Sequence, residues 1–93
     1  MFRLIKVKGT SMVPTLMPGD YVLTKKPRFI RAGLIYVIEH ERHGLIVKRA
    51  TRLEGDLISY VSDNSEGSSG QVSAAQVKRV AWLAITPKGV RRI

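Results

Sequence analysis

The feature that most constrains the fold is a series of short segments in which apolar and polar residues alternate. These segments are rich in β-branched and aromatic residues and are bounded by Gly, Pro, Asp or Asn, which is typical of β-strands joined by turns. They cover residues 2–8, 20–26, 34–41, 45–49, 57–61 and 77–85. The pattern predicts a mostly β, compact fold of short antiparallel strands.

The connections between these segments are short. The third and fourth segments are joined by residues 42–44, which predicts a hairpin, and a second hairpin is expected to turn at residues 54–56. Residues 73–76 and 11–16 have room for a helical turn, and two prolines keep the latter short. Residues 62–70, with four Ser and two Gly among them, are expected to form a loop.

The length of 93 residues predicts a single domain over residues 1–93, because two cores would each bury too little apolar surface. The longest apolar run, Val80–Ile85, is far shorter than the roughly 20 residues that span a bilayer. The first residues alternate charged and apolar side chains, unlike a signal peptide. The chain is therefore expected to be cytoplasmic or peripherally membrane-associated, with neither a signal peptide nor a membrane span.

The formal net charge of +9 is distributed unevenly along the chain. Residues 1–38 carry seven basic residues against one acidic residue, and residues 67–93 carry five against none, whereas the middle is slightly acidic. Basic ends would attract a polyanion or an anionic membrane. They are better explained by Lys and Arg that protect strand edges from pairing with other chains. Aromatic residues are too scattered for a base-stacking platform, so nucleic acid is disfavoured as a partner.

Ser11 is the candidate nucleophile. It directly follows the first predicted strand, on a turn imposed by Gly9 and Pro14, so its hydroxyl would project from a rigid edge. A serine hydroxyl needs a base at neutral pH. Both histidines, His40 and His43, lie on the predicted hairpin turn, where a solvated tip explains them better than a metal site.

Lys48 is the candidate base. It follows the apolar residues 45–47, where desolvation would lower its pKa and leave a neutral amine able to accept a proton. A Ser-Lys dyad is a known variant of triad chemistry. The chain has no cysteine, which excludes a thiol nucleophile, a thiolate metal site and a disulfide framework.

Three boxes of this sequence resemble signal peptidase I. Ser11 and Met12, with Pro14-Thr15-Leu16 and Gly19-Asp20 after them, resemble its nucleophile box. Val47-Lys48-Arg49, followed by Gly55-Asp56, resembles its lysine box, and Asp63-Asn64 with Ser68 resembles its third box. LexA-like self-cleaving repressors share Ser-Met, Gly-Asp and Val-Lys-Arg, but the proline and the third box favour signal peptidases. Small soluble relatives, such as the maturation protease of nickel-type superoxide dismutase, have a similar size.

The resemblance implies a role for each of these residues. Ser11 would attack the scissile carbonyl, Lys48 would act as general base, and Ser68 would orient the lysine amine. The Ser11 N–H would donate to the oxyanion, and Met12 would exclude water. Gly9 stands where several relatives place a second hydroxyl donor, so oxyanion stabilisation would rest either on the backbone or, if the turn differs, on Thr10. After Ser68 the family's Asp-Ser-Arg is replaced by residues 69–72, so the ion pair that braces this loop in relatives is expected to be absent.

These residues together predict a serine endopeptidase that cleaves a protein or peptide through an acyl-enzyme, with neither metal nor cofactor. The family's substrates bind as an extended strand beside the enzyme's own strands. The alternative is a catalytically degenerate module of the same fold that dimerises or binds an acidic partner. A homodimer is compatible with either function.

Overall fold

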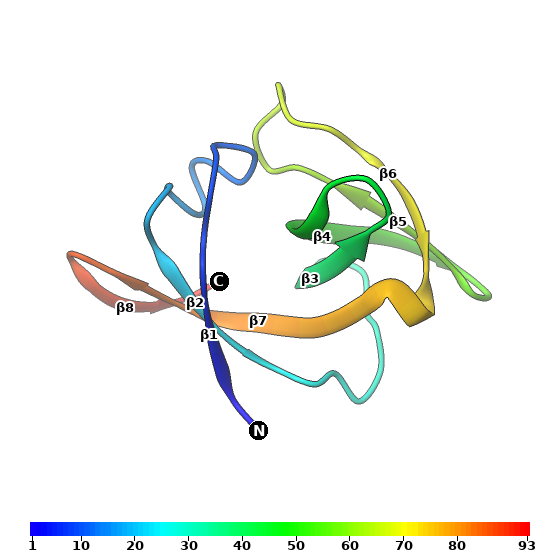
Figure 1. Ribbon diagram of the computed structural model, residues 1–93, viewed down its shortest axis with the longest axis horizontal. Coiled ribbons are helices and arrows are strands. Elements are labelled where there is room, and N and C mark those ends of the chain that lie inside the picture. Colours follow the sequence, from blue (N-terminus) through cyan, green and yellow to red (C-terminus); the bar gives the residue numbers. More distant parts are fainter.

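The computed structural model describes residues 1–93, and its regular secondary structure is β-strand except for one short helix (Figure 1). The strands are β1 (Arg3–Lys6), β2 (Tyr21–Lys25), β3 (Ile35–His40), β4 (Gly44–Glu54), β5 (Leu57–Val61), β6 (Gly70–Ser73), β7 (Val77–Thr86) and β8 (Gly89–Arg92), and the 3-10 helix is η1 (Ala74–Gln76). They form one antiparallel sheet in the order β1-β2-β7-β3-β4-β5-β6, with β8 paired to β7. The predicted fold class, mostly β with antiparallel pairing, is confirmed.

All six predicted strands are present, and both predicted hairpins form. The β3–β4 hairpin turns before Gly44, and the β4–β5 hairpin turns at Gly55, whose φ of +60° suits glycine. β4 is longer than predicted, because it continues from Arg49 to Glu54 along β5. β6 and β8 were missed. The helical turn predicted at residues 73–76 is η1, whereas residues 11–16 contain one helical hydrogen bond, from Leu16 N–H to the Met12 carbonyl.

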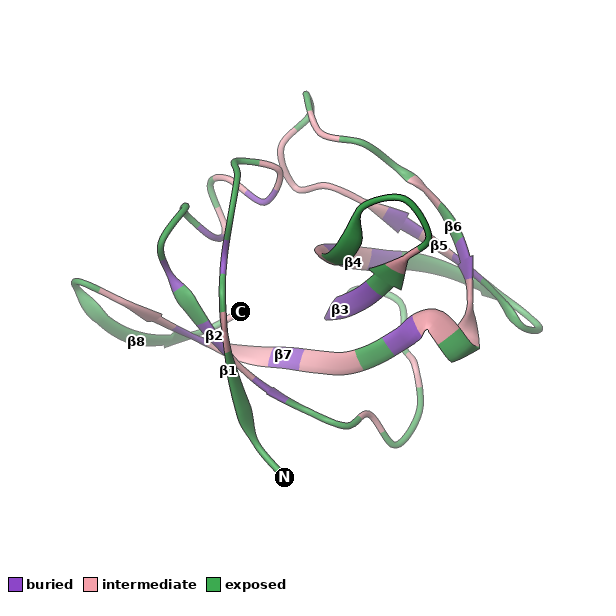
Figure 2. Ribbon diagram, in the orientation of Figure 1, coloured by how far each residue is buried: buried purple, intermediate pink, exposed green.

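The sheet encloses two apolar clusters. Figure 2 marks the buried positions along the strands in purple. One cluster joins the turn after β1 to β2, β3 and β7, and it includes Met12, Leu16, Val22, Ile35 and Ala84. The other lies between β3, β4, β5, β6 and β7. Met12 and Leu16 are spaced by four and point into the first cluster, so burial of this pair holds the turn that carries Ser11 against the sheet.

Trp82 on β7 is half-buried, although its place in an alternating strand predicts a core position. Its ring lies 5.8 Å from the ring of Phe2 and 5.5 Å from Lys25 Nζ, measured to the centroids. It therefore packs at the surface, between an aromatic ring and a cation. No helix of the structure is long and apolar enough to cross a membrane.

Candidate active site

Ser11 lies on a tight turn that follows β1. The Val7 N–H donates to the Asp20 carbonyl at 2.7 Å, and the Gly19 N–H donates to the Val7 carbonyl at 2.9 Å, so the two ends of this loop are tied together. Gly9 has a φ of +73°, a left-handed conformation that favours glycine. Ser11 itself is half-buried, with its hydroxyl and its N–H outside the hydrogen-bond network of the turn.

Lys48 lies on β4 opposite Tyr36 of β3 and is 5% exposed. No carboxylate forms an ion pair with it. Burial lowers the pKa of the Lys48 amine below its ordinary value, because desolvation disfavours the ammonium. The structure thus buries this lysine, and the burial shifts its pKa in the direction that the sequence led us to expect.

The hydroxyl that contacts the lysine belongs to Ser62 and not to Ser68. Lys48 Nζ donates to Ser62 Oγ at 2.7 Å, and Ser62 Oγ donates to the Ser68 carbonyl oxygen at 2.7 Å. The expectation for Ser68 is therefore corrected: it contributes its backbone, and its side chain is exposed. The physical reason is the fold of residues 62–69, which turns the Ser68 carbonyl toward Ser62.

The two hydrogen bonds of Ser62 determine how the lysine amine is presented. The Ser62 proton is engaged by a carbonyl, which can only accept, so toward the amine Ser62 acts as an acceptor. A neutral amine has two N–H donors and one lone pair. Donation to Ser62 uses one N–H and leaves the lone pair free to take a proton. This arrangement suits a general base.

Asp63 joins the segment of Ser11 to the strand of Lys48. It accepts two hydrogen bonds from Arg49, from Nε at 2.8 Å and Nη2 at 2.7 Å, and a third from Thr15 Oγ1. The Arg49 hydrogen bonds hold the pKa of the Asp63 carboxyl below its usual range, against the opposing effect of burial. The same contact raises the pKa of Arg49. Asp63 thus connects Arg49, the residue next to Lys48, to Thr15 in the segment that follows Ser11.

Asn64 completes the connection. Its N–H donates to the Ser11 carbonyl at 2.9 Å, and its Nδ2 donates to the Thr10 carbonyl at 3.0 Å. The Asp63 N–H points to Met12 Sδ at 3.5 Å. Asp63 and Asn64 therefore brace the site. The loop is braced by an ion pair after all, but the pair is Arg49–Asp63 and not the pair of the family's missing Asp-Ser-Arg.

The other predicted site residues lie on the same turn. Met12 is 1% exposed and packs beneath Ser11 in the first apolar cluster, while Gly9 and Thr10 are exposed before it. No hydrogen bond joins Ser11 Oγ to Lys48 Nζ in this structure. Residues 62–64 contact both of their surroundings: Ser62 contacts the end of the lysine side chain, and Asn64 contacts the backbone of the Ser11 turn.

The first half of β4 has a free edge that leads to Lys48. Residues 44–49 pair with β3 on one side, but β5 pairs with β4 only from Arg49 onward. The backbone of residues 45–47 is therefore open on its other side, and Leu45 is 61% exposed. Such an edge can take an added strand from another chain.

His40 and His43 lie at the β3–β4 turn, where their rings stack at 4.7 Å and line a hollow together with Ser68. No group of three or more His, Cys, Asp or Glu side chains is close enough to hold a metal ion.

A comparison against known families identifies the family of this chain. The model of the peptidase S24-like family matches residues 2–85, and the chain therefore belongs to this family of the LexA and signal peptidase Ser-Lys superfamily. The search of curated proteins found no match.

Two contacts of the candidate site were not predicted from the sequence. Ser62 precedes the third box and carries no motif of its own, so its contact with Lys48 depends on the fold of the loop. The Arg49–Asp63 ion pair joins a residue of the second box to a residue of the third box. The presence of both boxes in one chain is the only sequence feature that points to this ion pair.

Proposed function

We propose that this chain is a serine endopeptidase in which Ser11 is the nucleophile and Lys48 the general base. The observation that carries the proposal is the buried Lys48 amine, which has no carboxylate partner and has its one hydrogen bond to a neutral hydroxyl. A buried lysine is costly to keep charged, and such lysines serve as bases in proteins. Membership of a peptidase family supports the same function.

In the proposed reaction the Lys48 amine takes the proton of Ser11 Oγ as this oxygen attacks the scissile carbonyl carbon. The tetrahedral intermediate collapses when the lysine ammonium gives its proton to the leaving amine, which breaks the C–N bond and leaves an acyl-enzyme on Ser11. Water, deprotonated by Lys48, then attacks the acyl carbon. The ester C–O bond breaks as the lysine ammonium returns this proton to Ser11 Oγ, which releases the carboxylic acid product and regenerates the free enzyme. The free Ser11 N–H is the candidate donor to the oxyanion.

The substrate is proposed to be a protein segment that binds in extended form along the open edge of residues 45–47. Main-chain hydrogen bonds to this edge would align the scissile bond with Lys48, which follows directly on the same strand. We further propose a processing role like that of the small signal-peptidase-like proteases. The Pro14-Thr15-Leu16 and Asp63-Asn64 segments of the boxes support this subfamily.

The experiment compares protein N-termini in host cells that carry either the wild-type chain or Ser11→Ala. New N-termini that depend on Ser11 are expected, and their sequences would give the cleavage motif. The matched control is Ser65→Ala, an exposed serine of the loop that braces the site. Identical N-termini in all three strains would contradict the proposal and favour the non-catalytic module.

A further inference from the structure

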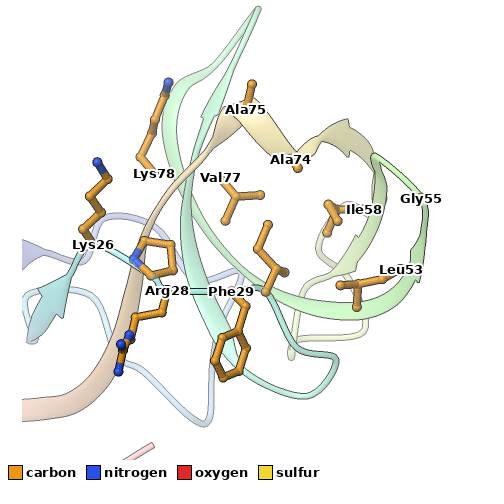
Figure 3. Close-up of a pocket in the computed structure, with 12 residues that line it drawn as sticks. Lys26, Arg28, Phe29, Leu53, Gly55, Ile58, Ala74, Ala75, Val77 and Lys78 are labelled. Carbon is orange, nitrogen blue, oxygen red and sulfur yellow. The ribbon is translucent and has the colours of Figure 1, made fainter.

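The loop between β2 and β3, residues 26–34, separates two surface hollows that are distinct from the Ser11 site. One hollow has a volume of about 510 Å³ and reaches β4, β5 and η1 (Figure 3). The other has a volume of about 340 Å³ and reaches the half-buried Trp82. Phe29, which is 60% exposed, lines both of them. We call this loop with its two hollows the basic groove.

The first hollow combines an apolar lining with cations. Ile58, Val77 and Leu53 are among its apolar residues. Figure 3 shows Lys26, Arg28 and Lys78 together on the side of the hollow opposite Leu53 and Ile58. A large exposed aromatic ring beside an apolar hollow is typical of a surface that binds a partner.

The second hollow repeats this combination. Its cations are Lys25, Arg28 and Arg31, and its apolar residues include Leu34. No acidic residue lines either hollow. The groove therefore offers five basic side chains and no acidic side chain.

The loop is held in place by its backbone. The Arg31 N–H donates to Tyr36 Oη at 2.8 Å, the Gly33 N–H donates to the Ala50 carbonyl at 2.7 Å, and Arg49 Nη1 donates to the Gly33 carbonyl at 2.6 Å. The Arg31 guanidinium lies 4.7 Å from the centroid of the Phe29 ring. A partner would therefore meet a preformed surface and lose less free energy in ordering it.

We propose that the basic groove docks an acidic segment of a partner protein, with carboxylates against Arg28 and its neighbouring cations and an apolar side chain beside Phe29. The charge is complementary to such a segment, and the apolar lining requires an apolar side chain as well. A flat lipid surface would leave the two hollows unfilled, and a nucleic acid would not use their apolar lining. Docking at the basic groove involves neither Ser11 nor Lys48, so it can be tested whether or not the chain is an active peptidase.

The probe is a fluorescein-labelled peptide of glutamate and leucine, titrated against the Ser11→Ala protein so that cleavage cannot remove the probe. Arg28→Glu is expected to weaken binding by about tenfold or more, since it reverses a charge shared by both hollows. Lys88→Glu is the matched control, because it changes the net charge equally at the exposed β7–β8 turn. Lys88→Glu should leave binding unchanged. Phe29→Ala should weaken binding without any change of charge.

Two further peptides separate the contributions: replacing the leucines by serines, or the glutamates by glutamines, should each abolish binding. Equal weakening by Arg28→Glu and Lys88→Glu would overturn the proposal, because it would show a general charge effect. No binding of the acidic peptide would also overturn it. So would an Arg28-dependent affinity for phosphatidylserine vesicles or duplex DNA that exceeds the affinity for the peptide. Circular dichroism establishes that each variant is folded.

Discussion

Lys48 Nζ donates a hydrogen bond to Ser62 Oγ at 2.7 Å, and this contact sets the orientation of the proposed base. Ser62→Ala removes the acceptor and allows the amine to rotate, so peptide cleavage should fall by about tenfold to a hundredfold. Ser68→Ala should retain nearly full activity, because Ser68 contributes only its carbonyl. Rates of both variants on one peptide substrate provide the test. A larger loss in Ser68→Ala than in Ser62→Ala would contradict the assignment.

Gly67 leaves room for Ser62. A Cβ at this position would lie 2.4 Å from both Ser62 Cβ and Ser62 Oγ, so Gly67→Ala must displace Ser62. We expect cleavage to fall at least as far as in Ser62→Ala, because the displaced side chain can also push on the lysine. Steady-state kinetics on the same peptide measure the effect. Ser65→Ala, an exposed neighbour, is the control, and full activity of Gly67→Ala would show that Ser62 does not position the base.

Asp63→Asn should destabilise the protein by about 1–3 kcal/mol, since it leaves Arg49 without its charged partner. The pKa of Asp63 is lowered in the folded state, so its stabilising effect is complete above the unfolded pKa of about 4 and is lost as the pH falls through the folded value. Thermal unfolding between neutral and strongly acidic pH should show a smaller acid-dependent loss in Asp63→Asn. Identical pH dependence in both proteins would contradict this role.

Cleavage should increase with pH. Burial lowers the pKa of Lys48, so the neutral amine is populated below the pH at which an exposed lysine titrates, and the rate should rise through this range to a plateau. The logarithm of kcat/KM, measured from pH 6 to 10, gives the profile. A rate that falls steadily with increasing pH would exclude a lysine base.

The sequence predicted the fold class because alternation and turn residues are strong in the long strands, such as residues 34–41 and 77–85. β6 and β8 were not predicted because each has only four residues. Each contains a single apolar side chain, Val72 in β6 and Val90 in β8, so no alternation of apolar and polar residues can be recognised. β4 was predicted to end at Arg49 because its second half is polar and exposed. Pairing with β5 extends it, and that tertiary effect is absent from local sequence.

The sequence likewise predicted some residues of the candidate site and not others. Ser11 and Lys48 could be named because each occupies a local pattern: a turn after a strand, and a base after an apolar run. Ser62 could not be named, because its role depends on a carbonyl six residues away that only the folded loop presents. The Arg49–Asp63 pair likewise joins residues far apart in sequence.

The most direct test of the central claim is the cleavage rate of Ser11→Ala and Lys48→Met on a peptide that the wild-type protein cleaves. Both rates should fall by at least about 10³-fold, because a dyad acts as a unit. Lys48→Met should unfold at the same or a higher temperature than wild type, because methionine avoids the cost of a buried charge. Wild-type rates in either folded, pure variant would show that Ser11 and Lys48 are not the catalytic pair.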